Sequence, residues 1–227
     1  MVHIAAQRTV QRAASAGSTA TAVDLREEAF TTRQQQVLTA ALELLVEGGA
    51  GLTMTAVARR ASCSKETLYK WFGDRDGLLT ATVQWQAAKV RVPRVDRHRL
   101  DAVTLRRSIE QFARDLLGTL SGEISVTLNR LAVTHAGEEK RGLGAIVLEN
   151  GRLEMGRRLK PVLEAGRDAR LLRFESSEEA FRTFYGLVVR DVQLRLLLGD
   201  EFKLTPEQVE ADALRATEQF LALFEKH

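Results

Sequence analysis

The stretch ASCSKETLYKWFGDRDGLL, residues 61–79, gathers polar groups of several kinds within a dozen positions. It contains serine and threonine hydroxyls, a tyrosine phenol and two lysine ammonium groups. All of these groups donate hydrogen bonds, and the ammonium groups add positive charge, so together they suit the oxygen atoms of an anion. The same stretch holds the large apolar residues Trp71 and Phe72. The polar groups must therefore sit on an element that is buried along one side.

Helical spacing separates the polar from the apolar groups of this stretch. At about 100° per residue, Leu68, Trp71 and Phe72 fall on one face, which we expect to be buried. The polar residues of positions 66–70 fall on the other faces and point outward. A helix of two turns is unstable alone in water, so neighbouring helices must hold its apolar face while its polar face stays free for a partner.

Two more helices are predicted directly before this one. Apolar residues recur at helical spacing over residues 37–45, and Gly48–Gly49 provides a stop. Thr53 can cap a second, short helix, and after a tight break Ser64 can cap the third. Two short helices joined by a tight turn, the second with an exposed polar face, are typical of a helix-turn-helix whose second helix enters the major groove of DNA.

Composition and charge agree with a protein that meets a polyanion through one part only. The chain has 227 residues, of which 44% are apolar, and a net charge of +3. Residues 1–91 carry 11 Lys and Arg against 8 Asp and Glu, whereas residues 92–227 carry 22 of each. No uncharged apolar run reaches about 18 residues, so we expect no membrane span. The single cysteine cannot form an internal disulfide, and no metal-ligand spacing stands out.

The chain is predicted to divide into three parts. Residues 1–23 hold two arginines, many small residues and no acid, a composition that organellar transit peptides share. Because they are small polar residues without periodicity, we interpret residues 1–32 instead as a flexible N-terminal extension of a cytoplasmic protein. Residues 33–91 are interpreted as a DNA-binding domain with a connecting fourth helix. Residues 92–227 are interpreted as a larger helical domain. The basic segment RVPRVDRHR around Pro93 marks the boundary.

The segment from Arg33 to Leu79 resembles the DNA-binding region of the TetR/AcrR family of transcriptional regulators. The resemblance rests on the core S-K-x-T-L-Y-x-x-F, followed by a polar turn and R-D-G-L-L. It implies an all-α protein of about nine helices. An N-terminal three-helix helix-turn-helix domain would be joined to a larger C-terminal helical domain for ligand binding and dimerisation.

The family pattern also implies which residues face the duplex. Tyr69 and Lys70 are expected to hold phosphates, whereas Lys65, Glu66 and Thr67 are expected nearest the base edges. The full set of implied DNA contacts is Arg33, Thr53, Thr55, Ser64, Lys65, Glu66, Thr67, Tyr69, Lys70 and Arg75.

Two residues of the turn depart from the family pattern. Ser62 stands where the family usually has glycine, so we expect a short polar side chain in a left-handed conformation. Cys63 stands where the family usually has valine, and it could serve as a redox sensor. We interpret it instead as a small core residue, because burial among apolar groups makes a thiol inert.

Apolar periodicity predicts the helices of the larger domain at about residues 101–121, 123–136, 140–168, 177–199 and 205–226. The last two carry apolar residues on two faces, so that one face can join the core and the other can pair with a second copy in a homodimer. The alternative is that both faces are buried within one chain. The predicted interface residues are Ala180, Phe184, Leu187, Leu194, Val209, Ala213 and Phe220.

The apolar helices of the larger domain can also enclose a lipophilic pocket for a small-molecule effector. Its predicted lining residues are Trp85, Phe112, Leu116, Leu131 and His135. No nucleophile with its base, carboxylate pair or metal-ligand set stands out, so we predict no enzyme activity, cofactor or metal site. The resulting hypothesis is a dimeric repressor that binds a palindromic operator in double-stranded DNA and is released by an effector. The alternative is a helical adaptor that binds protein through the exposed face of the third helix.

Overall fold

The computed structural model describes residues 30–48, 52–92, 95–134, 136 and 142–225. Every regular element within these residues is a helix, which confirms the all-α prediction, and an isolated β-bridge joins Leu172 to Glu225. Most of the predicted extension over residues 1–32 lies outside the described residues. In chain order the helices are α1 (Thr32–Gly48), α2 (Met54–Arg60), α3 (Lys65–Phe72), α4 (Arg75–Ala88), α5 (Ala102–Ser121), α6 (Glu123–Thr134), α7 (Leu143–Val147), the π-helical η2 (Leu148–Leu153), α8 (Glu154–Asp168), α9 (Ser177–Val189), α10 (Val192–Leu197) and α11 (Pro206–Phe224).

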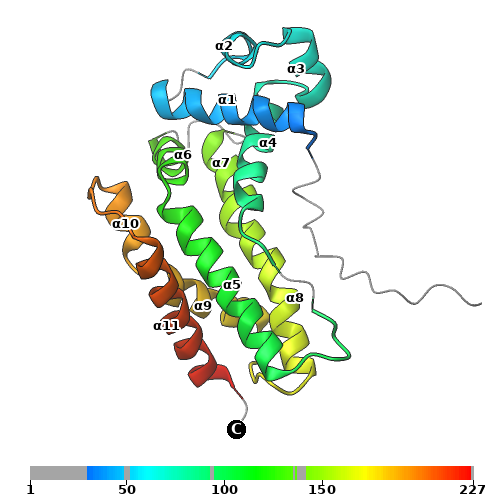
Figure 1. Ribbon diagram of the computed structural model, residues 1–227, viewed down its shortest axis with the longest axis vertical. Helices are drawn as coiled ribbons and strands as arrows, with labels where there is room; N and C mark the ends of the chain where they lie inside the picture. Colours follow the sequence, from blue (N-terminus) through cyan, green and yellow to red (C-terminus); the bar gives the residue numbers. More distant parts are fainter. Residues whose placement is uncertain (1–29, 49–51, 93–94, 135, 137–141, 226–227) are drawn as a thin grey trace, which may run out of the picture.

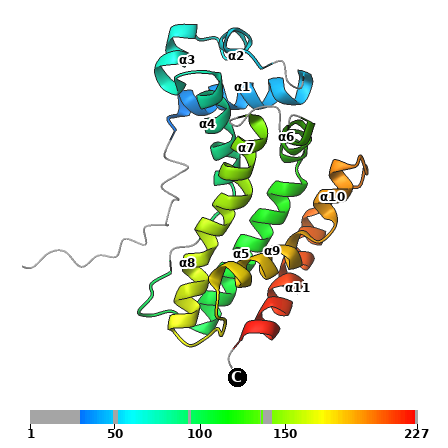
Figure 2. The same cartoon turned by 180° about the vertical axis from the view of Figure 1, so that it is seen from behind.

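The helices form a small cap on one end of a larger bundle. Helices α1, α2 and α3 lie across the end of the bundle, and α4 runs from this cap down beside α7 and α8 (Figure 1). Seen from behind, α9, α10 and α11 cover the side of α5 that faces away from α4 (Figure 2). Helix α4 is therefore the element that joins the two parts.

The apolar side chains form two cores. The N-terminal core centres on fully buried residues of the cap and of α4, such as Leu38, Leu68 and Leu78, and it extends to Leu128 of α6 and Ile146 of α7. Two helices of the larger domain thus help to hold the cap in place. Burial of this kind is the main stabilising term for short helices that would not form alone.

The core of the larger domain is rich in aromatic residues. Phe112, Phe184 and Phe220 are completely buried, and the Phe184 and Phe220 ring centroids lie 5.3 Å apart in an edge-to-face arrangement. Ala87 and Val90, at the end of α4 and just beyond it, belong to the same core. The first part of α4 is consequently packed into one core and its last part into the other.

Two of the predicted helices are interrupted. The helix expected over residues 177–199 breaks at Arg190, whose φ of 45° and ψ of −127° end α9 before the chain restarts as α10. The helix expected over residues 140–168 contains the π-helical segment Leu148–Leu153. Apolar residues keep helical spacing across the break at Arg190, from Val188 to Val192, so periodicity alone does not reveal that break.

Candidate nucleic-acid interface and effector cavity

Helix α2 ends in a turn that sets the direction of α3. Ser62 has a φ of 50°, which confirms the predicted left-handed conformation. The Cys63 amide donates to the Ala58 carbonyl at 3.0 Å, and the Ser62 amide donates to the Arg59 carbonyl at 3.3 Å. This pair of bonds is the Schellman pattern of helix ends. Cys63 is half-buried against the N-terminal core, so it is less enclosed than the core position predicted for it.

Arg33 of α1 fastens this turn. Its Nη2 atom donates to the carbonyl oxygens of Ala61 and Ser62, at 2.8 Å in both cases. These two carbonyls lie at the end of α2, where no intrahelical donor remains for them. The Arg33 side chain stays exposed, so this predicted DNA contact holds the turn in shape from the protein surface.

Side-chain caps begin α2 and α3 at the predicted residues. The Thr53 hydroxyl accepts from the Ala56 amide at 3.1 Å, and the Ser64 hydroxyl accepts from the Thr67 amide at 3.1 Å. The Ser64 and Thr67 hydroxyl oxygens lie 3.0 Å apart. The half-buried Thr67 hydroxyl is therefore shared between the cap and the outer face of α3.

Helix α3 has the division of faces that its sequence predicts. Leu68 is completely buried, and Trp71 and Phe72 are half-buried, with ring centroids 6.2 Å apart in an edge-to-face contact. Tyr69 is 52% exposed. The other predicted DNA contacts with exposed side chains are Arg33, Thr53, Thr55, Ser64, Lys65, Glu66, Lys70 and Arg75.

The exposed face of the helix-turn-helix carries positive side chains that are not tied up in salt bridges. Lys65, Lys70 and Arg59 form no salt bridge with any residue that the structure describes. Arg60, by contrast, pairs with two acids of α1, with its Nη2 atom 2.5 Å from Glu47 Oε2 and its Nη1 atom 3.3 Å from Glu43 Oε2. The surface around α3 is thus the part of this domain most suited to meet phosphates.

Glu66 adds a negative charge in the first turn of α3. Its pKa is lowered because its own backbone amide and the Ser64 side chain hydrogen-bond the carboxylate, with a smaller contribution from Lys65. The carboxylate is therefore ionised at neutral pH, where it can only accept hydrogen bonds. Such a group suits an amino donor such as cytosine N4 and opposes contact with phosphate.

The tight turn from α3 into α4 requires a glycine. A Cβ atom at Gly77 would lie 1.9 Å from the Phe72 carbonyl oxygen, so a side chain there would force α3 and α4 apart. Asp74 caps α4 by accepting from the Gly77 amide at 2.8 Å. The Arg75 Nε atom donates to the Leu52 carbonyl at 3.0 Å. This predicted phosphate contact consequently also ties α4 to the start of α2.

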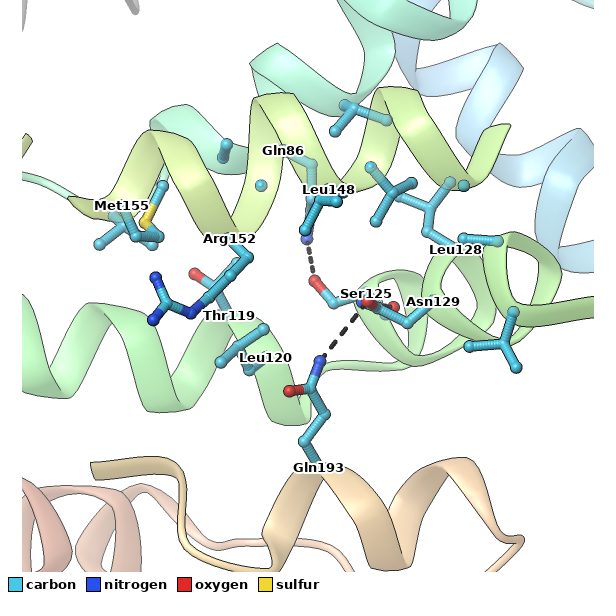
Figure 3. A pocket seen from close by; sticks show the side chains of 18 of the residues that line it. Gln86, Thr119, Leu120, Ser125, Leu128, Asn129, Leu148, Arg152, Met155 and Gln193 are labelled. Carbon is cyan, nitrogen blue, oxygen red and sulfur yellow. Dashed lines mark hydrogen bonds between the residues drawn. The ribbon is translucent and has the colours of Figure 1, made fainter. Parts of the chain in front are cut away.

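A cavity of about 440 Å³ lies in the larger domain between α4, α5, α6 and the α7–η2–α8 segment (Figure 3). Its walls are mainly apolar and include Val83, Leu116, Leu128 and Met155. Tyr185 of α9 and Gln193 of α10 complete the lining. This volume and this apolar character are typical of sites for small organic ligands.

A few uncharged polar side chains project into the cavity. Gln86 of α4 is 7% exposed, and its Nε2 atom donates to the Ser125 hydroxyl at 3.1 Å. Its Oε1 atom has no hydrogen-bond partner among the described residues. Figure 3 shows this contact together with a second one, in which Gln193 Nε2 donates to Asn129 Oδ1 at 3.5 Å. Both contacts link helices that form different walls.

Arg152 is the one formally charged residue among the described residues that line the cavity. Its guanidinium carbon lies 4.2 Å from the ring centroid of Tyr185 and 4.7 Å from that of Phe181. Stacking on aromatic faces stabilises a guanidinium without using its hydrogen-bond donors. Figure 3 shows the guanidinium on the Met155 side of the cavity, away from the contact between Gln86 and Ser125.

The predicted pocket residues lie in different places. Leu116 is part of the cavity wall. Phe112 is wrong as a lining residue, because it is not among the residues that line the cavity; it is completely buried in the core of the larger domain. Trp85 and Leu131 are also wrong, because neither is among the residues that line the cavity; both are partly buried against the N-terminal core. His135 lies outside the described residues.

Sequence reasoning missed the polar lining, although one residue left a signal. Val83 and Ala87 of α4 and Val90 just beyond it recur at helical spacing, and Gln86 falls within that stripe. A polar residue on an otherwise apolar inward face is an indication of a site, because burial of a polar group is unfavourable without a partner.

Four of the predicted interface residues are wrong. Ala180, Phe184, Ala213 and Phe220 are completely buried in the core of their own chain, so no second copy can reach them. The physical reason is that α9 and α11 pack against each other and against α5, which turns these stripes inward. The other three predicted residues remain accessible to differing degrees: Leu187 and Val209 are half-buried and Leu194 is 60% exposed.

The described residues show neither a membrane span nor a metal site. No helix in that part of the chain has the length and apolar character needed to cross a bilayer. The same residues include no group of three or more His, Cys, Asp and Glu side chains placed to hold a metal ion.

Two family models match the chain, one on each part of the fold. The model described as bacterial regulatory proteins, tetR family, matches residues 37–82. The model described as AefR-like transcriptional repressor, C-terminal domain, matches residues 107–226, which is more than half of the chain.

Solved structures and a curated relative agree with these matches. A TetR transcriptional regulator from Agrobacterium tumefaciens is 46% identical, with a TM-score of 0.73 over 87% of this chain and 97% of that one. The flavonoid-responsive regulator FrrA is 28% identical, with a TM-score of 0.63 over 86% of this chain and 98% of that one. The HTH-type transcriptional regulator BetI of Paraburkholderia phytofirmans is 41% identical over 66 residues, which is 26% of this chain and 34% of the relative. This last match therefore spans about a third of the relative.

The matched regions coincide with the helix-turn-helix and with the domain that encloses the cavity. Both parts of the molecule thus point to the same kind of protein: the chain belongs to the TetR family of DNA-binding transcriptional regulators.

Proposed function

We propose that this regulator is a cytoplasmic, homodimeric repressor that binds a palindromic operator and leaves it when a small lipophilic effector occupies the cavity. The observation that carries the proposal is the double attachment of α4. Its residues Leu78 and Leu79 are buried in the N-terminal core, whereas Gln86 and Ala87 line the cavity. A ligand that favours a different position of α4 must therefore also move α3, the helix proposed to read the DNA.

The outer face of α3 is the proposed DNA-reading surface. Tyr69 and Lys70 extend from its second turn and would hold phosphates. Lys65, Glu66 and Thr67 lie in the first turn, which is the part of a recognition helix that contacts base edges. The order of these side chains along α3 supports a division between positioning and reading.

A dimer is supported by exposed leucines on the C-terminal helices. Leu194 of α10 is 60% exposed, and Leu198, the residue that caps the end of α10, is 80% exposed. Leu214 of α11 is 37% exposed. Exposed large apolar side chains are candidates for contact with a second copy. Two copies related by a twofold axis would present two α3 helices to half-sites about 34–36 Å apart.

The proposals of a repressor role and of an effector are supported by the names of similar proteins. One matching family model is named for a transcriptional repressor, and FrrA is named as a flavonoid-responsive regulator. The mainly apolar cavity of about 440 Å³ supports the proposal that this chain also responds to a small organic molecule.

Selection of bound fragments from random DNA tests the operator. We expect a palindromic winner whose binding is lost when Leu194 and Leu198 are both replaced by Glu, because burying acidic groups at the interface is unfavourable. Light scattering should show that this double variant is monomeric. Val103→Glu, an apolar-to-acidic change at a 56% exposed site on α5, serves as the control and should remain dimeric. A double variant that stays dimeric would place the interface elsewhere.

A further inference from the structure

The amide of Gln86 is the buried polar group of the cavity whose hydrogen bonding is incomplete. Its side chain is 7% exposed, and its Oε1 atom has no partner among the described residues. Leaving such an atom unpaired in a buried place is unfavourable. Since Gln86 lines the cavity, a ligand can reach this atom from within.

The chemistry of the contact between Gln86 and Ser125 narrows what the ligand must offer. With Nε2 donating to the Ser125 hydroxyl at 3.1 Å, the Oε1 atom is left to accept from a ligand. If the amide turns over, the serine hydroxyl donates to Oε1 and the NH₂ group is left to donate instead. A hydroxyl group satisfies both arrangements, because it donates and accepts, whereas an ether or a hydrocarbon fails in the first arrangement.

The charges around the cavity also limit the charge that the ligand can carry. No Asp or Glu is among the described lining residues, so a cationic ligand would be desolvated without a counter-charge. Arg152 forms no salt bridge with a described residue, and its stacked guanidinium keeps donors available for an anion. The pKa of Glu178 is lowered chiefly by its bond with Lys160 at 2.9 Å and to a smaller extent by Arg152. Glu178 is thus already engaged.

We propose that the cavity binds an apolar compound that carries a hydroxyl group, with Gln86 reading the hydroxyl and Arg152 favouring a neutral or anionic molecule over a cation. This inference rests on the proposed function and deepens it by giving the chemical class of the effector. The apolar remainder of the ligand would pack against Val83, Leu116 and Leu128, which supply binding energy without selectivity for polar groups.

A matched set of biphenyl compounds tests the class by titration calorimetry on the full chain. We expect para-phenylphenol to bind the wild type about tenfold more tightly than biphenyl or para-methoxybiphenyl, which corresponds to one hydrogen bond to a buried acceptor. Gln86→Leu should remove this preference. Gln84→Leu is the matched control, because Gln84 lies exposed on the same helix and bonds Asn150 instead. It should keep the preference.

The charge of the ligand is tested in the same assay. Biphenylcarboxylate should bind the wild type more tightly than biphenylmethylammonium, and Arg152→Met should narrow that difference. Equal binding of biphenyl and para-phenylphenol to the wild type would overturn the proposal without using any variant. A phenol preference that survives Gln86→Leu, or failure of every compound to bind, would overturn it as well.

Measuring operator release in parallel separates this inference from the proposed function. If biphenyl and para-phenylphenol bind equally and both release the DNA, the proposed control of DNA binding by the cavity is supported, and the proposal that the ligand carries a hydroxyl group is wrong. If para-phenylphenol is preferred through Gln86 and the DNA stays bound, the ligand class stands and release by an effector is wrong.

Discussion

Lys70→Ala gives the sharpest test of the DNA-reading surface. The Lys70 side chain is exposed on the last turn of α3 and forms no salt bridge with a described residue, so its ammonium group is available to a phosphate. Each phosphate that a protein neutralises contributes about −0.9 to the slope of log K against log salt concentration. The proposed dimer would present two copies of Lys70, so the variant should lose about 1.8 units of slope.

The size of the defect should therefore depend on salt. Over a fourfold change in salt, a slope difference of about 1.8 corresponds to roughly a tenfold change in the ratio of wild-type to variant affinity. The loss should be larger at low salt and similar for every duplex sequence, because a phosphate contact carries no sequence information. Fluorescence anisotropy with a labelled duplex at several salt concentrations measures both quantities.

A second lysine controls for the change in net charge. Lys203 is exposed in the segment between α10 and α11, so Lys203→Ala removes the same charge far along the chain from the reading helix. Its slope should match that of the wild type, because charges more than a Debye length of about 10 Å away are largely screened. Parallel lines for Lys70→Ala and wild type would show that Lys70 does not contact phosphate.

Two further predictions concern stability. Arg190→Gly should raise the free energy of unfolding by about 1 kcal/mol in chemical denaturation, because relief of roughly 2 kcal/mol of backbone strain at φ 45° exceeds the entropy of an added glycine. Arg190→Ala loses the same contact with Asp212 but keeps the strain, so any gain there would contradict this reasoning. Glu210→Gln should flatten the acid side of the stability profile. The hydrogen bond from Arg114 lowers the pKa of Glu210. The ionised Glu210 therefore stabilises the fold above the ordinary carboxyl pKa, and this stabilisation is lost as the pH falls through the lowered pKa. If stability at acid pH depends on pH in the same way in Glu210→Gln and in the wild type, the ion pair does not make this contribution.

The parts of the molecule that could be predicted from the sequence are those set by local chemistry. Thr53 and Ser64 cap their helices because a hydroxyl before the first turn satisfies free amides, whatever lies farther away. The burial of Leu68 could be predicted as well, because a helix as short as α3 is stable only when one of its faces is buried.

The parts that could not be predicted depend on packing between distant segments. Helices α9 and α11 each carry two similar apolar stripes, and packing against α5 decides which stripe turns inward. The sequence therefore placed Phe184 and Phe220 at a dimer interface, whereas both lie in the core. The break at Arg190 places a long cationic side chain where glycine would be expected. The cavity likewise exists only where α4, α6 and α8 meet.

The polar contacts of α4 explain how a ligand of modest size could affect a distant helix. Arg158 of α8, whose side chain is 10% exposed, donates to the carbonyls of Ala87 at 3.0 Å and Val90 at 3.1 Å. Gln86 bonds Ser125 of α6. The last turns of α4 are thus held by two helices that also form walls of the cavity, and a close-packed core transmits displacement instead of absorbing it. A ligand that separates α6 from α8 must break one of these contacts or carry α4 with it, and the close approach at Gly77 would pass that movement to α3. A ligand that fills the cavity without displacing α4 should bind without releasing DNA.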